Sequence, residues 1–360
     1  MLINFIGTRG THPTSGQGTL SFIVDNKIVF DICPEFVISY TKFIESWNTN
    51  LTENLQQIQN LHGTPSFAKI EHIFISHLHY DHWGGLRHFL IWSQMFEASF
   101  REERPIHIYI PKKNLELFQL RMQELFQIPR EQYLEEVDFF LRYLMVEIDI
   151  SLAKFVRIHA IEGGESIVLN KYKIQTYENK HFRGSLSYKL LSTKYKLNEV
   201  RFKESGIPRG PLLSKLQKES KLEFNGRIIQ VEEIFDLKTT ILAYSGDTQI
   251  DQKLLEWVQD STFLIHESTY FEDEEQYHTD SHTSLEELLP YLDKFTNLEL
   301  FIPVHFSGRY TWTQVLEKIQ ELVTNDKIIK IYPPKLGSII HFNEKTQNVL
   351  QEELKLLDSF

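Results

Sequence analysis

Cysteine is almost absent from this sequence of 360 residues, in which Cys33 is the one example. A single thiol cannot form a disulfide within the chain or a multi-thiolate metal cluster, so both kinds of scaffold are excluded. No apolar run approaches the roughly 20 residues needed to cross a bilayer. The first residues, Met1–Gly7, contain no basic region and no small-residue cleavage site, so we expect a cytoplasmic protein without a signal peptide or membrane contact.

Positive charge is also scarce, because 38 Lys and Arg stand against 49 Asp and Glu and give a formal net charge of −11. This balance argues weakly against a polyanionic partner. The charge is uneven, however, since residues 180–221 hold eleven basic and three acidic residues. Such a basic patch on an acidic body can still steer a polyanion at short range. A solvated, lysine-rich loop is the alternative interpretation.

Short runs of β-branched and aromatic residues predict strands, and longer amphipathic stretches predict helices. Asp25-Asn26 is a two-residue break typical of a hairpin. Strands are expected at 2–6, 20–24, 27–31, 70–76, 106–110, 145–149, 153–159, 165–169, 172–178, 185–191, 239–245, 262–267, 299–304, 327–332 and 337–341. Helices are expected at 35–65 (a polar stretch), 82–96, 113–144, 250–258, 283–294, 312–324 and in the tail 343–360, whose residues 343–358 are amphipathic.

The segment 193–236 interrupts this pattern. It carries Gly206, Pro208, Gly210 and Pro211 and is interpreted as a projecting arm. On either side, strands and helices are mixed in two similar halves. This arrangement favours an α/β or α+β fold in which sheets pack face to face with helices outside.

The strongest chemical signal is the run Ser76-His77-Leu78-His79-Tyr80-Asp81-His82, directly after a predicted buried strand and before a predicted helix. Residues two apart in an extended segment point the same way, so His77 and His79 can approach one cation together. After the turn, Asp81 and His82 can face a second cation. Imidazole and carboxylate suit Zn²⁺ and, less selectively, Mn²⁺ or Fe. A polar loop that happens to be rich in histidine is the alternative.

This run is the His-x-His-x-Asp-His motif, and with it the sequence resembles the metallo-β-lactamase superfamily. The resemblance implies one domain over 1–360, an αββα sandwich of two packed mixed β-sheets with helices outside. It also implies further ligands at strand ends, where His181, Asp247 and His305 stand in order. By this resemblance, one metal is held by His77, His79 and His181, the other by Asp81, His82 and His305, and Asp247 bridges them. Two Zn²⁺ per chain, with Mn²⁺ or Fe as alternatives, are therefore expected.

Four further stretches resemble one branch of that superfamily, ribonuclease Z, the endonuclease that trims tRNA 3′ ends. They are His266-Glu267-Ser268-Thr269, Ser281-His282-Thr283-Ser284, His305-Phe306-Ser307-Gly308-Arg309-Tyr310, and Gly206–Leu212 with Lys215 and Leu216. They are similar to the family's His-Glu-Ala-Thr, Gly-His-Ser-Thr, His-Phe-Ser-x-Arg-Tyr and Gly-Pro segments. With Phe5–Thr8 and Pro13-Thr14, the likeness spans roughly residues 1–31, 70–110 and 172–340.

The resemblance implies a zinc-dependent endoribonuclease that removes 3′ trailers from tRNA precursors and commonly acts as a homodimer. Asp81 would be the general base, and His282, oriented by Glu267, would protonate the departing 3′ oxygen. Ser307, Arg309 and Tyr310 would contact the phosphate or terminal nucleotides, because guanidinium matches phosphate geometry. The basic arm would grip the tRNA body through its backbone, with Gly206, Pro208, Arg209, Gly210, Pro211 and Lys215 as the contact residues.

Three stretches depart from the family pattern. Asp31-Ile32-Cys33-Pro34-Glu35-Phe36 stands where the family has Asp-Cys-Gly-Glu-Gly-Thr, Ser185-Leu186-Ser187-Tyr188 replaces Ser-x-Gly-Tyr, and Ser281 replaces a glycine. None of these changes removes a ligand, but they alter how a 3′ end would be seated. The remaining histidines have no ligand context: His12, His62, His72, His88, His107, His159, His278 and His341.

Three other functions stay open. The first is a phosphodiesterase of the same fold that acts on small or cyclic phosphodiesters or on other RNA. The second is a metal-binding or RNA-binding module without catalysis, against which the retained Asp81, Glu267 and His282 argue. The third is a lactamase-like hydrolase of amides or esters, in which the arm and Arg309 would have no evident purpose.

Overall fold

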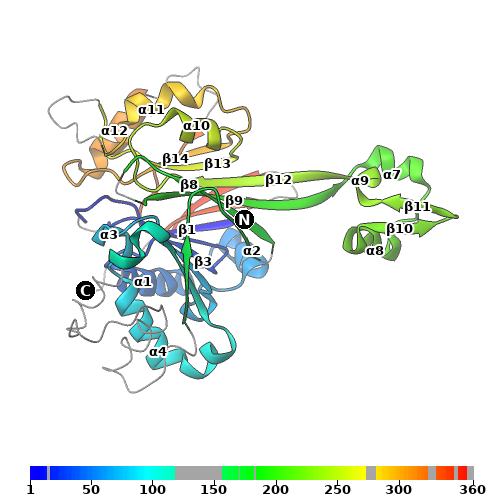
Figure 1. Ribbon diagram of the computed structural model, residues 1–360, viewed down its shortest axis with the longest axis horizontal. Coiled ribbons are helices and arrows are strands. Elements are labelled where there is room, and N and C mark those ends of the chain that lie inside the picture. The colour runs from blue at the N-terminus through cyan, green and yellow to red at the C-terminus, as the bar shows by residue number, and fades with distance from the viewer. Residues whose placement is uncertain are drawn as a thin grey trace.

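Two mixed β-sheets pack face to face in this computed structural model, and helices cover both outer faces (Figure 1). The predicted αββα sandwich is therefore confirmed. The structure describes residues 1–13, 17–117, 156–169, 171–181, 184–272, 281–322, 330–343 and 348–354. Among these residues, no helix is both long and apolar enough to cross a membrane.

The first sheet has the strand order β17-β16-β1-β2-β3-β4-β5-β6. Strands β3 to β6 are parallel, whereas β17, β16, β1, β2 and β3 pair antiparallel. Asp25 and Asn26 both have positive φ, 49° and 60°, as a tight hairpin turn between β2 and β3 requires. The strands are β1 (Leu2–Gly7), β2 (Ser21–Val24), β3 (Ile28–Phe30), β4 (His72–Phe74), β5 (Ile106–Pro111), β6 (Val156–Ile161), β16 (Ser338–Asn343) and β17 (Asn348–Glu353).

The second sheet has the order β15-β14-β13-β12-β9-β8-β7. Strands β12 to β15 are parallel, and β7, β8, β9 and β12 pair antiparallel, so β8, β12, β13 and β14 run in one direction. The strands are β7 (Ser166–Leu169), β8 (Tyr172–Glu178), β9 (Leu186–Leu197), β12 (Phe235–Tyr244), β13 (Phe263–Glu267), β14 (Leu300–Val304) and β15 (Lys330–Ile331).

Helices α1 (Phe36–Thr49), α2 (Glu53–His62) and α4 (Leu86–Glu103) cover the first sheet, and α10 (Gln252–Val258), α11 (Leu285–Leu292) and α12 (Trp312–Leu322) cover the second (Figure 1). The prediction of a polar stretch over 35–65 is wrong for its first helix. Phe36, Tyr40, Phe43 and Trp47 form one buried face of α1 at helical spacing. Between the sheets lies an aromatic core that includes Phe22, Phe30, Phe74, Tyr188 and Tyr244.

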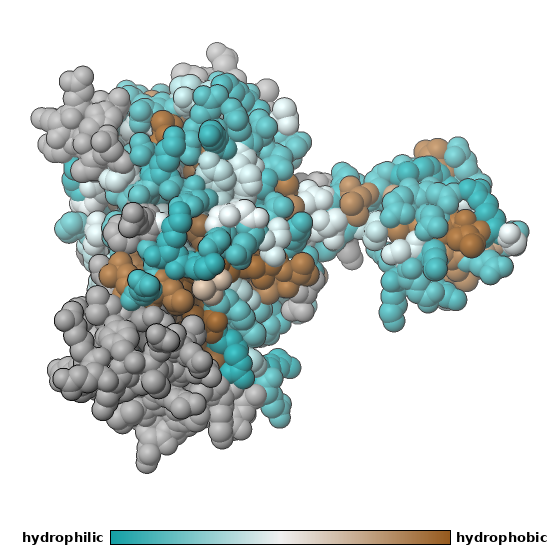
Figure 2. All heavy atoms as spheres, in the orientation of Figure 1, coloured by the Kyte–Doolittle hydropathy of each residue, from teal (hydrophilic) through white to brown (hydrophobic). Residues whose placement is uncertain are grey.

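Strands β9 and β12 continue beyond the body as a two-stranded ribbon that carries a separate head (Figure 1). The head consists of α7 (Glu199–Ser205), α8 (Pro211–Glu219), β10 (Lys221–Phe224), β11 (Arg227–Gln230) and α9 (Val231–Ile234). It has its own apolar cluster, with Phe202, Leu216 and Ile229 among its members. Its surface is mostly hydrophilic with apolar patches (Figure 2), and Val200 and Ile228 are both exposed. The head and the outer part of the ribbon are formed by the residues of the expected arm, 193–236.

The C-terminal helix expected over 343–360 is wrong, because residues 348–353 form β17. This strand pairs antiparallel with β16, with Val349 opposite Phe342. Val349 packs against the core between the sheets and Leu350 against the core under α1, so successive side chains go to opposite faces, as in a strand. The expected helix 113–144 beyond residue 117 and the expected strand 145–149 lie outside the described residues.

Candidate metal centre

The candidate ligands stand at the carboxyl ends of strands that run in the same direction within each sheet. The run from His77 to His82 follows β4 and continues into the short helix α3 (Tyr80–Trp83). His181 follows β8, Asp247 follows β12 and His305 follows β14. Strand ends that face one edge of the sandwich bring residues far apart in the chain together, and here all seven side chains meet in two groups.

The first group consists of His77, His79, His181 and Asp247, whose nearest donor atoms all lie within 4.8 Å of one another. Nδ1 of His79 lies 2.9 Å from Nε2 of His77 and 3.3 Å from Nε2 of His181. His79 therefore offers Nδ1 to the centre, whereas the other two histidines offer Nε2. Three imidazoles converging on one point form a typical divalent-metal site.

The second group consists of Asp81, His82 and His305. Oδ2 of Asp81 lies 3.4 Å from Nε2 of both histidines. Oδ2 of Asp247 lies 3.3 Å from the same two nitrogens and 3.7 Å and 4.0 Å from Nε2 of His77 and His181. This one oxygen is thus shared by both groups, which is the position of a bridging carboxylate.

The donor set fits divalent cations. Oδ1 of Asp81, Nε2 of His82 and Oδ1 of Asp247 are buried and have no hydrogen-bond partner within the described part of the chain. Buried polar atoms of this kind are rare in folded proteins, and a bound cation or a water next to it would satisfy them. Burial lowers the pKa of His77 and His181 and lowers that of His79 to about 4, so these rings are neutral, as metal ligands must be.

Three of the candidate ligand histidines are oriented through their second nitrogen. Nδ1 of His82 lies 2.7 Å from Oδ2 of Asp31, Nδ1 of His181 lies 2.6 Å from the Ser281 carbonyl, and Nδ1 of His305 lies 2.8 Å from Oγ1 of Thr269. Each contact directs Nε2 toward the centre, as partners of metal-binding histidines commonly do. Burial alone would lower the pKa of His82, but the Asp247, Asp81 and Asp31 carboxylates outweigh it and raise that pKa.

Sequence reasoning missed several of these supporting residues. Asp31 is predicted only as the end of a strand and the start of a divergent stretch. No role is predicted for Asn179, two residues before His181. Its Nδ2 donates to the carbonyls of Ser245 and Asp247, at 2.6 Å and 3.2 Å, and so holds the loop of the bridging carboxylate. A polar residue at the end of a strand was the available signal, but its partner depends on the fold.

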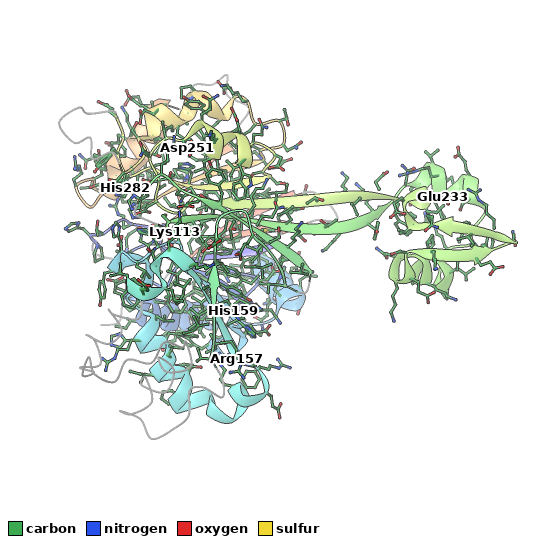
Figure 3. All side chains as sticks on the ribbon, in the orientation of Figure 1. Lys113, Arg157, His159, Glu233, Asp251 and His282 are labelled. Carbon is green, nitrogen blue, oxygen red and sulfur yellow. The ribbon has the colours of Figure 1, made fainter. Side chains whose placement is uncertain are left out.

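Glu267 and His282 lie together beside the ligands. Nδ1 of His282 is 3.1 Å and 3.2 Å from the two carboxylate oxygens of Glu267, and 3.9 Å from Oδ2 of Asp247. Burial alone would lower the pKa of His282, but these carboxylates outweigh it and raise the pKa to about 9. His282 lies on the side of the body away from the arm (Figure 3). The pair can therefore hold a proton next to the centre.

The loop after His305 carries the residues that are expected to contact substrate. Arg309 is exposed, and its Cζ lies 5.1 Å from the ring centroid of Tyr270 and 6.0 Å from that of Tyr310. Its Nε donates to Oγ of Ser307 at 3.3 Å. The expected arm residues, in contrast, lie in the head at the end of the ribbon. They are Gly206, Pro208, Arg209, Gly210, Pro211 and Lys215, and none of them is brought to the centre.

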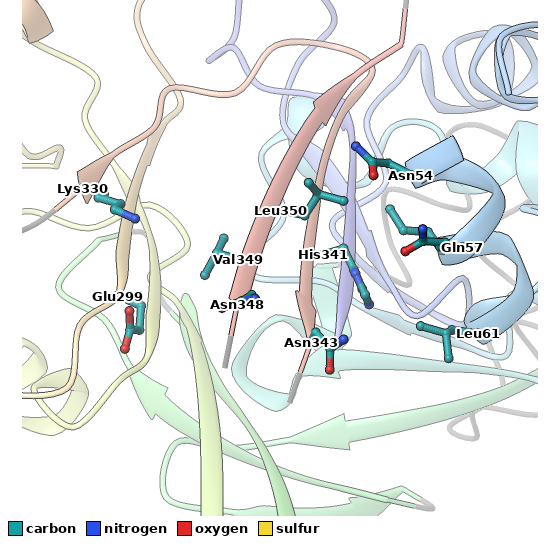
Figure 4. A pocket seen from close by; sticks show the side chains of 11 residues that line it. Asn54, Gln57, Leu61, Glu299, Lys330, His341, Asn343, Asn348, Val349 and Leu350 are labelled. Atoms are coloured by element: carbon teal, nitrogen blue, oxygen red, sulfur yellow. The ribbon is translucent and has the colours of Figure 1, made fainter. Parts of the chain in front are cut away.

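A pocket of about 540 Å³ lies at the opposite end of β14 from His305 (Figure 4). Glu299 precedes that strand, and Lys330 begins the neighbouring β15. The lining is mostly polar and includes Asn54, Gln57, Asn343 and Asn348. None of the ligands or proton-transfer candidates lines this pocket, so it is separate from the metal centre.

Comparison with known proteins supports both the fold and the resemblance. A family model described as Anti-Pycsar protein Apyc1 matches residues 49–198. Ribonuclease Z of Pyrococcus horikoshii is 27% identical over 322 residues, which cover 87% of this chain and 89% of that protein.

Two solved structures are similar over almost their full length. The metallo-β-lactamase fold protein YhfI of Bacillus subtilis has a TM-score of 0.56 at 10% identity and covers 98% of this chain and 99% of its own. The short form of human tRNase Z has a TM-score of 0.52 at 15% identity and covers 95% and 99%. The chain therefore has the metallo-β-lactamase fold, and its predicted resemblance to ribonuclease Z is confirmed over most of its length.

Proposed function

We propose that this chain is a zinc-dependent ribonuclease Z, which hydrolyses one phosphodiester of a tRNA precursor and so removes its 3′ trailer. One observation carries the proposal: seven metal donors converge next to the pair of Glu267 and His282. Relatives named ribonuclease Z support it. Mn²⁺ or Fe are the alternatives to zinc. A homodimer, which rests on the resemblance, and a location in the cytoplasm complete the proposal.

One cation would be held by His77, His79 and His181. The other would be held by Asp81, His82 and His305, and Asp247 would help to hold both. Two bound cations supply a water of lowered pKa and stabilise the attacking and leaving oxygens of a phosphoryl transfer. The two oxygens of Asp81 have different surroundings, since Oδ2 faces His82 and His305 whereas Oδ1 has no hydrogen-bond partner among the described residues. Oδ1 is therefore the atom that can accept the proton of the attacking water.

His282 would donate the proton that the departing 3′ oxygen needs. Nδ1 of its ring is directed at Glu267, so Nε2 is the nitrogen left for the substrate. The Glu267 carboxylate favours the protonated ring, which makes His282 an acid at neutral pH. An alkoxide is a poor leaving group, so this proton is needed for RNA and for other alkyl phosphodiesters, but not for a diester whose leaving group is stable as an anion.

The substrate contacts in this proposal are those that the resemblance implies. Arg309, with Ser307 and Tyr310 beside it, would contact a phosphate or a terminal nucleotide, because its guanidinium matches phosphate geometry. The head would contact the tRNA body through the phosphate backbone, using Gly206, Pro208, Arg209, Gly210, Pro211 and Lys215. Such contacts are independent of sequence and sensitive to salt.

Cleavage of a tRNA precursor with a 3′ trailer tests the proposal directly. The zinc-loaded chain should release the trailer in one cut, and Asp81→Ala should lower the rate at least about 100-fold, since it removes a ligand and a general base. Glu317→Ala, an exposed carboxylate on α12, serves as the matched control and should cleave normally. Unchanged cleavage by Asp81→Ala would contradict the assigned mechanism.

A second candidate is a phosphodiesterase that acts on small or cyclic phosphodiesters. Residues 49–198 match a family model other than that of ribonuclease Z, and this match is consistent with a substrate other than tRNA. The divergent stretch from Asp31 to Phe36 is consistent with a different substrate. Comparison of kcat/KM on a tRNA precursor and on a cyclic mononucleotide separates the two. Activity on the cyclic mononucleotide alone would exclude the tRNA proposal.

A further inference from the structure

Thr269 connects the metal ligands to the proton-donor pair. It follows the end of β13 by two residues and is 6% exposed. Its Oγ1 lies 2.6 Å from Oε2 of Glu267, 2.8 Å from Nδ1 of His305 and 3.4 Å from Nδ1 of His282. A single hydroxyl thus contacts a candidate ligand and both residues of the acid pair.

The number of available protons fixes the direction of these hydrogen bonds. A threonine hydroxyl has one proton to donate and two lone pairs to accept with. Burial alone would raise the pKa of Glu267, but the charge of His282 outweighs it and lowers that pKa, so the carboxylate only accepts. The hydroxyl therefore donates to Oε2 of Glu267. Its lone pairs face His305, so Nδ1 of His305 must carry a proton and donate it.

This arrangement has a consequence for each neighbour. In His305 it selects the tautomer whose Nε2 is unprotonated, and that nitrogen lies 3.3 Å from Oδ2 of Asp247, inside the candidate centre. In Glu267 it fixes one oxygen, while the backbone N–H of Thr248 donates to the other at 2.6 Å. Both oxygens are then held in place opposite Nδ1 of His282.

We propose that Thr269 is a positioning residue that acts on both sides of the reaction through its hydroxyl. It holds His305 in the tautomer that can bind metal, and it holds Glu267 so that His282 is aimed at the leaving oxygen. The second part rests on the proposed function, whereas the first part concerns metal binding alone. Glu267 and His305 are 0% and 2% exposed, so water cannot readily replace the hydroxyl.

Two substitutions separate the hydroxyl from the shape of the side chain. Thr269→Val keeps the shape and removes the hydroxyl, and Thr269→Ser keeps the hydroxyl. Metal-free protein is titrated with Zn²⁺ against a competing chelator. Turnover is then measured on a tRNA precursor and on bis(p-nitrophenyl) phosphate, whose nitrophenolate leaves without a proton.

Thr269→Val should weaken zinc affinity by about 10- to 100-fold. It should also lower kcat on the tRNA precursor at least about tenfold more than kcat on the chromogenic diester, because only the alkoxide needs an acid. Thr269→Ser should restore both properties. A general loss of structure would lower both rates together and would not be rescued by serine.

Two results would overturn the inference: zinc affinity and substrate ratio both unchanged in Thr269→Val, or a serine variant as impaired as the valine variant. If Thr269→Val does not fold, Thr269→Ala carries the same expectations and is compared with serine in its place. If the unsubstituted chain does not cleave the tRNA precursor, the proposed function fails. The comparison of zinc affinities then still decides whether Thr269 positions His305.

Discussion

Oδ2 of Asp31 lies 2.7 Å from Nδ1 of His82, and this contact joins the first sheet to the metal centre. Asp31 directly follows β3 and has a left-handed backbone, with φ of 53°. Its carboxylate also accepts from the backbone N–H and hydroxyl of Ser76, at 2.7 Å and 2.8 Å, and from the hydroxyl of Tyr244 at 2.5 Å. The residue therefore ties β3, β4 and β12 to one ligand.

Replacement of Asp31 by Asn should weaken the second cation site. An amide has one accepting oxygen in place of two, so some of these donors lose their partner, and a misplaced His82 should lower zinc affinity by about 10- to 100-fold. Zinc titration of metal-free protein measures the effect. Tyr244→Phe is the matched control, because it removes one hydrogen-bond donor to Asp31 and keeps the contact between Asp31 and His82. Equal zinc affinity in Asp31→Asn and the unsubstituted chain would show that the contact is dispensable.

Removal of metal should destabilise the folded chain. The ligands are brought together only by folding, so a bound cation stabilises the native state by about 4 kcal/mol when free metal is a thousandfold above Kd. Addition of a chelator should therefore lower the Tm in a thermal melt. Asp247→Asn, which alters the bridging carboxylate, should respond much less to the chelator. If the chelator leaves the Tm of the unsubstituted chain unchanged, the chain does not carry bound metal.

Removal of the head should impair tRNA cleavage and spare small substrates. The ribbon pairs Thr193 with Thr239, so residues 194–238 can be replaced by Asn-Gly, which closes a two-residue hairpin. KM for the tRNA precursor should rise about tenfold or more at physiological salt, because phosphate contacts are lost. Turnover of bis(p-nitrophenyl) phosphate should stay unchanged and serves as the control. An unaltered KM for the precursor would exclude the arm as an RNA contact.

Acidic pH should lower the free energy of unfolding of the chain through a cluster of three histidines outside the candidate metal centre. His72, His107 and His159 lie on β4, β5 and β6, and Nδ1 of His107 is 2.9 Å from Nε2 of His159. Burial lowers the pKa of His72 to about 4 and also lowers those of His107 and His159. The unfolded chain therefore binds more protons below about pH 6.5, the ordinary histidine value. The stability from these neutral rings is complete above that pH and is lost as the pH falls toward 4.

Urea unfolding at pH 7.5 and pH 5 measures this dependence. His72→Gln should lose less stability between the two pH values than the unsubstituted chain does. His88→Gln, which replaces an exposed histidine on α4, should lose as much as the unsubstituted chain. An equal loss in all three proteins would show that His72 does not titrate with unfolding.

The convergence of the seven candidate ligands could be predicted from the sequence, because each of them follows the end of a strand. A histidine or aspartate directly after a short apolar strand is visible in the chain itself, and strand ends meet at the edges of sheets. The partners of those ligands could not be predicted in the same way. Asp31 with His82, and Thr269 with His305, are pairs whose members come from different strands, so their contact depends on how the strands pack.

The fold could be predicted from the sequence to a similar extent as the candidate site. The αββα sandwich followed from the resemblance, and hairpins such as the one at Asp25-Asn26 followed from their turn residues. The tail was predicted wrongly because the sequence Asn348–Glu353 is short and amphipathic, which suits a helix or an edge strand equally. Pairing with β16 decides the outcome, and that edge exists only after the first sheet has formed.

The strand β12 begins at the head and ends next to Asp247. From Phe235 to Tyr244 it is extended throughout, and ten residues of strand span about 30 Å. Within one chain, a molecule that touches both the head and the candidate metal centre must be at least that long. A short phosphodiester can therefore contact only one end of the ribbon, whereas a folded RNA is large enough to contact both ends.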